Sequence, residues 1–417
     1  MNKDNTIFIS YTFYPIEGGI QTYLKNIAQH WDTGKVRVYT NIEKKVPDLL
    51  KEPLIIKRFS FGSKNYLSAL IKIIRLLFKN KKSTYKKLKF LLLLMSSRSA
   101  LKNIANFTLN VYRDLQKSDF KPKFIQCSLP IYTGLVGVVT KFIFGSRLVI
   151  YIHGKELIKY EKLKNIRNLQ KFVFEYADII ISNSNYTKEK AVMLGAKSAK
   201  IKVVNLGADI DKFYPKNTKK KIYKKFDIPE NHKLLYTISH LIPRKGNDMV
   251  IKSLPKVLQK YSNVTYLIGG RGKYKKELKR LVNENNLTNH VKFLDYIEED
   301  DLNEIMNACD IFIMPNRQEG YDVEGYGIVF MEANACKKPV IGGNSGGVTD
   351  AIINGQTGLI VNPYSKENIS KKILFLLRND NLCSKMGKNG YELVLKKRNW
   401  ETVSSIIHSA IINKKEE

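Results

Sequence analysis

Two glutamates, Glu324 and Glu332, have types and spacing that could bind a carbohydrate ligand. They lie eight positions apart in the segment EGYDVEGYGIVFMEANACKKPVIGG, which follows a predicted buried strand, DIFIMPN. Glu324 falls in the loop after this strand, where a carboxylate can accept hydrogen bonds from sugar hydroxyls. Glu332 falls about one turn into the next helix, where it can accept hydrogen bonds from a ribose diol. Either glutamate alone also fits an ordinary surface residue, whereas the whole string favours a binding site.

The glycine-rich loop between the two glutamates is suited to a diphosphate. Its glycines let the backbone approach a ligand closely, and the helix after it begins with unpaired amides at the positive end of its dipole. The residues of this loop and helix start are Gly325, Tyr326, Gly327, Ile328 and Val329.

Alternating strands and helices must position this loop. The chain opens with a strand (TIFISYT), a glycine loop (PIEGGI) and a helix (IQTYLKNIAQHW), the start of a βα unit. Further strands are predicted at KVRVYTN, KFIQCSL, RLVIYIHG and ADIIISNS. A second series follows Pro215–Lys221, with strands at KLLYTISHL, NVTYLIGG, VKFLDYI, DIFIMPN, KPVIGG and GLIVNP. Such alternation predicts parallel sheets with helices on both faces.

We therefore expect an α/β fold of two doubly wound, Rossmann-like domains that face an interdomain cleft. The cleft is the expected ligand site, because ligands of such sheets bind beyond the carboxyl ends of the strands. The first domain is predicted over residues 1–205, with a basic helical insertion at about 64–118. The second is predicted over 206–395. A C-terminal helix, within 396–417, is expected to pack back on the first domain.

The composition limits the partners. Of 417 residues, 71 are Lys or Arg and 38 are Asp or Glu, so the net charge is +33. That charge suits nucleic acid, an anionic membrane or phosphorylated small molecules. No nucleic-acid reader motif accompanies the basic clusters, so we expect no nucleic-acid partner. Four widely spaced cysteines favour a reducing compartment and neither a zinc site nor a disulfide scaffold.

Targeting signals are not evident in the sequence. The N-terminal segment MNKDNTIFISYTFYP has no long apolar stretch, so no secretory signal is expected. The nearest candidate for a membrane span, Phe90 to Met95, is far shorter than the roughly 20 residues that a spanning helix needs. These observations predict a cytoplasmic protein, peripheral on the inner face of the cell membrane.

A basic segment at residues 65–97 mixes leucine and isoleucine with many lysines and no acidic residue. Ile71, Ile74, Leu77 and Phe78 are predicted to share one helix face. This composition favours an interfacial helix that lies on anionic lipid. The alternative is a pair of core-packed helices with a solvated lysine face.

Residues 319–343 resemble the matching motif of family 4 retaining glycosyltransferases, whose two-Rossmann-domain fold is called GT-B. The resemblance covers nearly the whole chain and is strongest over about 230–362. The segment DVEGYGIVFMEA is most similar to the corresponding segment of bacterial phosphatidylinositol-mannoside-type mannosyltransferases. The resemblance implies that the first domain binds an acceptor and the second a nucleotide-diphosphate sugar.

The resemblance also implies roles for residues elsewhere. His153 in YIHGKEL corresponds to a histidine beside the transferred sugar, and Lys245 in ISHLIPRKGND to a cation that neutralises the leaving diphosphate. The family usually has Arg at the position of His240, so Arg244 or protonated His240 would supply the second charge. The implied catalytic residues are His153, Glu324, Lys245 and Arg244. The implied donor-binding residues are Gly18, Gly19, His240, Gly270, Tyr296, Ile297, Gly325, Tyr326, Gly327, Ile328, Val329 and Glu332.

The expected function is transfer of a hexose, with GDP-mannose as the favoured donor, to a lipid or to a lipid-linked or cell-surface saccharide. Transfer would rely on positioning and on charge stabilisation of the diphosphate, with no metal and no cofactor. One alternative is a transferase of UDP-N-acetylglucosamine or another UDP-hexose in polysaccharide assembly. Another is a non-catalytic paralogue that binds a sugar nucleotide, which His240 leaves open. A sugar phosphorylase would need a cofactor-bearing lysine site that the sequence does not reveal.

Overall fold

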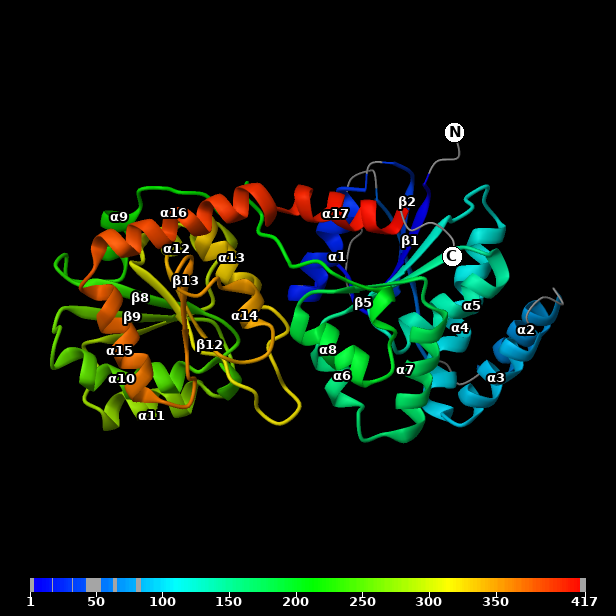
Figure 1. Ribbon diagram of the computed structural model, residues 1–417, viewed down its shortest axis with the longest axis horizontal. Helices are drawn as coiled ribbons and strands as arrows, with labels where there is room; N and C mark the ends of the chain where they lie inside the picture. Colours follow the sequence, from blue (N-terminus) through cyan, green and yellow to red (C-terminus); the bar gives the residue numbers. More distant parts are fainter. Residues whose placement is uncertain are drawn as a thin grey trace. The chain divides into compact units, whose positions relative to one another are not determined.

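The computed structural model describes residues 4–16, 18–31, 33–42, 54–62, 66–79 and 84–412, without the side chains of Lys79, Arg98 and Asp300. The chain divides into two compact units (Figure 1). Unit 1 comprises Met1–Val204 and Ser404–Glu417, and unit 2 comprises Asn205–Val403. Each unit is built around one parallel β-sheet.

The sheet of unit 1 has seven strands in the order β3-β2-β1-β4-β5-β6-β7, and every described pairing is parallel. The order reverses between β1 and β4, which makes this pair the topological switch point. The strands are β1 (Thr6–Ile9), β2 (Val36–Asn41), β3 (Leu54–Phe59), β4 (Phe124–Cys127), β5 (Arg147–Ile152), β6 (Ile179–Ser182) and β7 (Ile201–Val203).

The helices of unit 1 close a core of buried aliphatic and aromatic side chains. They are α1 (Gly19–Gln29), α2 (Tyr66–Lys79), α3 (Thr84–Met95), α4 (Arg98–Gln116), α5 (Thr133–Phe144), α6 (Lys155–Lys159), α7 (Lys164–Tyr176) and α8 (Asn185–Met193), with a short 3-10 turn at Ser198–Lys200. The last part of α17 (Trp400–Ile412) also belongs to this unit. Its Ser404 hydroxyl donates to the carbonyls of Ile27 and His30, and Thr33 lies 2.6 Å from the His408 ring nitrogen Nε2.

The basic segment forms α2 and α3, which contact each other and pack on α4. Leu77 is buried, and Ile74 and Phe78 pack against the core. The predicted apolar face of α2 therefore serves the core, and the prediction that it meets lipid is wrong. Ile71, which was predicted on the same face, is instead half exposed. Residues 80–83 lie outside the described part of the chain.

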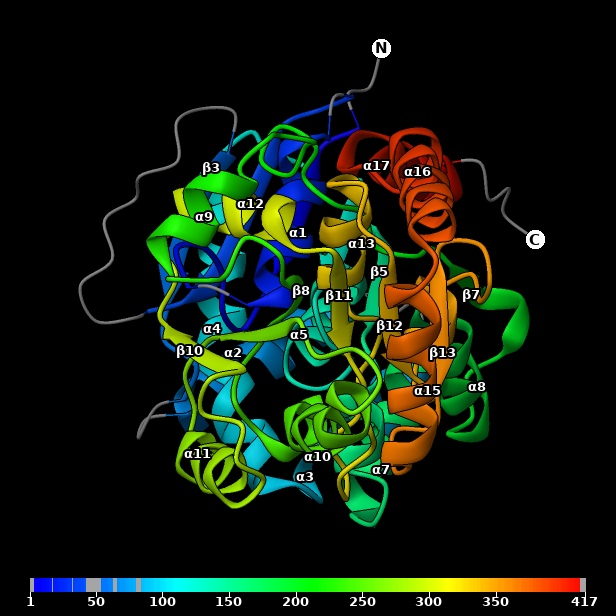
Figure 2. The same cartoon turned by 90° about the vertical axis from the view of Figure 1, so that its left-hand side faces the viewer.

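Unit 2 has six strands in the order β10-β9-β8-β11-β12-β13, again all parallel (Figure 2). The strands are β8 (Lys233–Ile238), β9 (Val264–Gly269), β10 (Val291–Asp295), β11 (Ile311–Met314), β12 (Val340–Gly343) and β13 (Gly358–Val361). All six were predicted, and the prediction of two doubly wound α/β units is confirmed. The switch point lies between β8 and β11.

Helices cover both faces of this sheet. Figure 1 shows α12, α13 and α16 on one side and α10, α11 and α15 on the other. The helices of unit 2 are α9 (Lys219–Lys225), η2 (Pro243–Lys245), α10 (Asn247–Leu258), α11 (Lys275–Glu284), α12 (Glu299–Ala308), α13 (Ile328–Ala335), α14 (Val348–Ala351), α15 (Lys366–Leu377) and α16 (Asp380–Lys397). Between the helices and the sheet lies a second core of buried aliphatic side chains.

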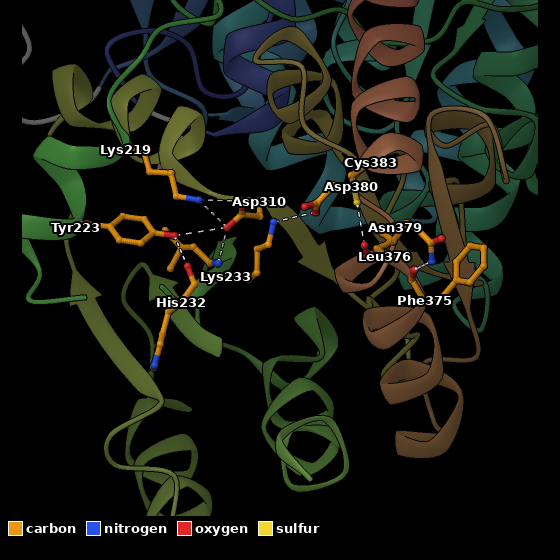
Figure 3. Close-up of polar contacts among 11 residues, drawn as sticks. Lys219, Tyr223, His232, Lys233, Asp310, Phe375, Leu376, Asn379, Asp380 and Cys383 are labelled. Atoms are coloured by element: carbon orange, nitrogen blue, oxygen red, sulfur yellow. Dashed lines mark hydrogen bonds and ion pairs between the residues drawn. The ribbon is translucent and has the colours of Figure 1, made fainter. Parts of the chain in front are cut away.

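An ionic network ties the amino-terminal edge of this sheet together. Asp310, just before β11, accepts hydrogen bonds from the Leu234 amide at 2.7 Å and from Lys219 of α9 at 3.1 Å. Figure 3 shows Lys219 and Tyr223 pointing toward Asp310, and Lys233 toward Asp380. The carboxyl edge, where a ligand is expected, lies at the opposite ends of the strands.

None of the helices, as far as the described residues show, is long and apolar enough to cross a membrane.

Candidate functional site

Four side chains meet at the switch point of unit 2, where the loops after β8 and β11 lie side by side. The Glu324 carboxylate accepts hydrogen bonds from Arg244 Nη1 at 2.6 Å, from Lys245 Nζ at 2.5 Å and from Asn316 Nδ2 at 3.0 Å. The side chains of Arg244, Lys245 and Glu324 are only 13–15% exposed. A buried cluster of two cations and one carboxylate therefore occupies the expected ligand position.

The charges of this cluster depend on one another. Burial favours the neutral form of Glu324, but the nearby Lys245 and Arg244 cations outweigh it and lower the pKa of Glu324 to about 2. Burial also lowers the pKa of Lys245, against the opposing effect of Glu324. Arg244 also forms an ion pair with a second carboxylate, since its Nε lies 3.3 Å from Asp322 Oδ1. The cluster is held together by charge, and an incoming anion could take the place of Glu324 beside the cations.

Backbone contacts fix the loop that carries Glu324. The Gly347 amide donates to the Glu324 carbonyl at 2.9 Å. Gly346 has a φ of +58°, and a Cβ there would lie 2.2 Å from the same carbonyl oxygen. Only a glycine permits this close approach.

Helix α13 begins next to this loop, as predicted. Gly327 precedes it with a φ of +91°, so the amides of Ile328 and Val329 open the helix. The side chain of Tyr326 is buried, so only its backbone can face a ligand. Glu332 lies further along the helix, and burial raises its pKa to about 7, with Lys212 opposing. Near neutral pH this carboxyl group therefore exists in both protonation states.

The loops after β9 and β10 lie beside the β8 loop at the same edge. Gly270 has a φ of +117°, and a Cβ there would lie 1.9 Å from the Ser239 carbonyl oxygen. The Arg271 guanidinium lies over the Tyr296 ring, 4.8 Å from its centroid. Ile297 packs so closely on Gly269 that a Cβ on this glycine would meet it at 2.4 Å. An exposed aromatic ring with a stacked cation is a surface on which a nucleotide base can stack.

His240 also belongs to this edge. It follows β8, and its side chain is exposed, whereas Arg244 and Lys245 are largely buried. Of the cations predicted near the diphosphate, the structure joins Arg244 and Lys245 in one cluster with Glu324.

His153 lies in unit 1, directly after β5. Its Nε2 lies 3.0 Å from the Ser128 carbonyl, which can only accept, so Nε2 carries the proton and Nδ1 keeps a lone pair. Burial lowers the pKa of His153, although Glu156 and the Ser128 carbonyl oppose this. The imidazole is neutral at pH 7 and offers an acceptor at Nδ1. Asn183 supports the loop by donating to the His153 carbonyl at 3.2 Å.

The predicted glycine turn of unit 1 comes just before α1. Gly19 is the first residue of this helix. A Cβ on Gly18 would lie 2.4 Å from Gln21 Oε1, the end of a flexible side chain, so a larger residue there would have to displace Gln21. The turn follows β1, one of the two switch-point strands of the unit 1 sheet.

Sequence reasoning missed two polar supports of the unit 2 site. Asn316 donates to Glu324, and the buried pair Arg317–Asp248, 2.9 Å apart, fixes the same loop to α10. The signal was present, since Asn316 is the last residue of the predicted strand DIFIMPN and Arg317 follows it directly. Within the described ranges, no group of three or more His, Cys, Asp or Glu side chains could hold a metal ion.

Two family models together match most of the chain. Residues 17–212 match the model described as "Glycosyltransferase Family 4", and residues 218–393 match "Glycosyl transferases group 1".

Curated relatives give the same assignment. A "GDP-mannose-dependent alpha-(1-6)-phosphatidylinositol monomannoside mannosyltransferase" of Mycobacterium tuberculosis is 30% identical over 264 residues, or 63% of this chain and 68% of the relative. A "GDP-mannose-dependent monoacylated alpha-(1-6)-phosphatidylinositol monomannoside mannosyltransferase" of Corynebacterium glutamicum is 31% identical over 62% of this chain and 68% of the relative. An "N-acetyl-alpha-D-glucosaminyl L-malate synthase" of Bacillus anthracis is 24% identical over 64% and 68%.

Solved structures share the fold over nearly the full length. Anabaena HepE in complex with UDP has a TM-score of 0.77 and 20% identity, covering 98% of this chain and 99% of its own. Sucrose-phosphate synthase from Thermosynechococcus elongatus has a TM-score of 0.75 and 19% identity, covering 98% of each chain.

Proposed function

This chain belongs to the family 4 glycosyltransferases, and on that premise we propose that it moves a hexosyl group from a nucleotide-diphosphate sugar to a lipid or a lipid-linked or cell-surface saccharide. The observation that carries the proposal is the buried cluster of Arg244, Lys245 and Glu324 beside the first turn of α13. Two cations and a helix N-terminus together suit the charge of a leaving diphosphate.

In the proposed mechanism the diphosphate takes over the contacts that Glu324 makes in the free protein. Arg244 and Lys245 would then neutralise the charge that develops as the sugar–phosphate bond breaks. Glu324, released from the cations, would accept hydrogen bonds from the sugar hydroxyls. Glu332 would hold the ribose diol, and Tyr296 with Ile297 would lie at the base. The acceptor oxygen would attack the same face that the diphosphate leaves and give its proton to the leaving diphosphate, with retention of configuration.

His153 would act on the sugar side of the reaction. Its neutral ring has a free acceptor at Nδ1, which suits a hydrogen bond from a hydroxyl group. The Gly18-Gly19 turn of the same unit would let a ligand approach the backbone closely.

GDP-mannose is the donor that we propose, because the relatives at about 30% identity are named as GDP-mannose-dependent mannosyltransferases. A UDP-sugar is the second candidate, favoured by a relative named for N-acetylglucosaminyl transfer. We also propose that transfer needs neither metal nor cofactor; the support is that Arg244 and Lys245 form a largely buried pair of cations that could neutralise a diphosphate. Transfer that continues unchanged in excess EDTA is the expected result, and loss of transfer there would refute this part.

A donor panel tests the assignment. Thermal unfolding is measured with GDP-mannose, UDP-glucose, UDP-N-acetylglucosamine and a dTDP-sugar, since a ligand at about 100 times its Kd adds about 2.7 kcal/mol of stability. GDP-mannose should give the largest shift. A larger thermal shift with a UDP-sugar would make that UDP-sugar the assigned donor in place of GDP-mannose. Binding of a donor without turnover of any donor would favour a non-catalytic paralogue.

Two variants test the site itself. Lys245→Ala and Glu324→Ala should each abolish most of the turnover, whereas Lys371→Ala, at an exposed position of α15, should not. Wild-type turnover in both site variants would refute the assignment of these residues.

A further inference from the structure

A pocket in unit 2 lies at the carboxyl ends of β12 and β13 and is formed by residues that have no role in the proposed donor site. Asn344 directly follows β12, and Asn362 directly follows β13, the edge strand of the sheet. Tyr364 and Asn368 line it from the next loop and the first turn of α15. Its volume is about 480 Å³, and small-molecule sites usually occupy about 300–1,000 Å³.

Three asparagine side chains give this pocket hydrogen-bond donors. The Oδ1 atoms of Asn362 and Asn368 accept hydrogen bonds from the backbone amides of Tyr364 and Asn362, at 3.0 and 2.9 Å. Because a backbone amide can only donate, these bonds fix the oxygen end of each side chain and leave its amino group for another acceptor. Across the described part of the chain, no protein atom accepts a hydrogen bond from Nδ2 of Asn344, Asn362 or Asn368.

The pocket also combines an exposed aromatic ring with a neutral lining. Tyr364 is 64% exposed, and none of the described residues that line the pocket carries a charge. A site for phosphate or carboxylate normally contains Arg or Lys, which are abundant in this chain but do not line this pocket. A neutral sugar fits the lining better, because its hydroxyls can accept from amide groups while the apolar face of its ring packs on an aromatic side chain.

Two contacts join this pocket to the loop that carries Glu324. Tyr364 Oη donates to the Gln318 carbonyl at 3.0 Å, and Gln318 belongs to the segment between β11 and α13. The loop that begins at Asn344 supplies the Gly347 amide, which donates to the Glu324 carbonyl at 2.9 Å. The pocket therefore borders the candidate site at the same edge of the sheet.

We propose that this pocket binds a neutral hexose unit of a saccharide, at a subsite separate from the one that holds the nucleotide sugar. The inference rests on the proposed function, in which a saccharide is one class of acceptor. The ring of Tyr364 packs on one face of the hexose, and the amino groups of Asn344 and Asn362 donate to its hydroxyls. A saccharide held there stays close to the loop that carries Glu324.

The test measures binding of two neutral saccharides, mannotriose and diacetylchitobiose, to the full-length protein by saturation-transfer NMR titration. Tyr364→Ala should weaken binding of the preferred saccharide about tenfold or more, because the packing surface is lost. Tyr364→Phe keeps the ring and loses the hydrogen bond to Gln318, so its Kd should stay within about twofold of the wild type. The control Phe375→Ala removes a 47% exposed aromatic ring elsewhere in unit 2 and should bind like the wild type.

Two further variants test the amide donors. Asn362→Asp keeps the oxygen that accepts from the Tyr364 amide and removes the amino group. Asn344→Ala removes a side chain that makes no hydrogen bond to the described residues. Each variant should weaken saccharide binding about threefold or more, because one hydrogen bond to the sugar is lost. Unchanged binding in both variants would overturn the assignment of the pocket.

Donor-induced thermal shifts on the same variants separate this inference from the proposed function. The shifts should match that of the wild type, which also shows that the variants are folded. A wild type that shifts with a donor but binds neither saccharide overturns the sugar subsite and leaves the proposed function intact. Equal saccharide binding by Tyr364→Ala and Phe375→Ala overturns the subsite too, as do equal losses in Tyr364→Ala and Tyr364→Phe. Saccharide binding that depends on Tyr364, in a protein that binds no sugar nucleotide, supports the subsite and refutes the proposed function.

Discussion

Replacing Glu324 by glutamine should lower the stability of the ligand-free protein and raise its affinity for a nucleoside diphosphate. The substitution keeps the shape of the side chain and removes its charge. Arg244 and Lys245 would then lie buried beside each other, with Asp322 as the remaining carboxylate that contacts Arg244. A buried charge without its partner is strongly unfavourable.

The structure sets the size of the effect. The cations lower the pKa of Glu324 from 4.5 to about 2, which corresponds to about 3 kcal/mol of stability at about 1.4 kcal/mol per pH unit. Removal of one partner of a buried ion pair costs about 3–5 kcal/mol, so a loss near 3 kcal/mol is expected. Since the folded pKa is depressed, this stabilisation is complete above pH 4.5 and is lost as the pH falls toward 2. The wild type and the variant should therefore differ by a constant amount from pH 5 to pH 8.

A diphosphate restores the missing negative charge. In the wild type it must displace Glu324 from the two cations, whereas in the variant nothing competes. If half of the 3 kcal/mol is recovered, GDP or UDP should bind about tenfold more tightly to the variant. Urea unfolding measures the stability, titration calorimetry the affinity, and turnover should fall in the same variant.

Glu367→Gln is the matched control in the same unit. Glu367 pairs with Lys256 at 2.9 Å, but both side chains are about half exposed. Loss of this exposed pair should cost much less stability than the loss expected for Glu324→Gln and should leave nucleotide binding unchanged. The reasoning fails if Glu324→Gln is no less stable than Glu367→Gln, or if its affinity for a nucleoside diphosphate drops.

Three further predictions concern other parts of unit 2. Burial raises the pKa of Glu332 to about 7. The contribution of protonated Glu332 to the stability of the folded protein is therefore complete below pH 4.5 and is lost as the pH rises through 7. Nucleotide affinity should increase over the same pH range, because the ionised carboxylate accepts hydrogen bonds from the ribose. Calorimetry across pH checks this, and Glu332→Gln should give a flat profile. Gly270→Ala places a methyl group against the Ser239 carbonyl and should cost about 2–4 kcal/mol. Gly355→Ala, also at a positive φ (+79°) but with open space around it, should cost about 1–2 kcal/mol in the same urea unfolding assay. Asp310→Ala removes an acceptor of the Leu234 amide and should cost about 1–3 kcal/mol in urea unfolding, without changing nucleotide affinity.

The strands of unit 2 could be predicted because each is a short, largely apolar run next to a turn. Sequence reasoning missed two strands of unit 1, β3 and β7, and both are edges of the sheet. In β3 only Leu54 is buried, whereas Ile55 and Lys57 are exposed, and β7 has only three residues with a lysine in the middle. An edge strand is only partly covered, so its sequence lacks a continuous apolar signal.

The site shows the same division between local and distant information. The loop and helix start after β11 could be predicted, because glycines and a helix N-terminus are local features. The ion pairs of Glu324 with Arg244 and Lys245 could not, because they join residues 79 and 80 positions apart. The face of α2 was assigned to lipid wrongly, because periodicity alone does not say whether an apolar face meets lipid or the core.

The split of unit 1 along the chain has a consequence for biosynthesis. Its sheet and first eight helices precede residue 205, yet Ser404 and His408 of α17 supply contacts to the segment after α1. A ribosome therefore delivers every residue of unit 2 before it delivers the segment that completes unit 1. The first half of the protein to be made is the last to be finished, and until then the surface that α17 covers stays open to chaperones and proteases.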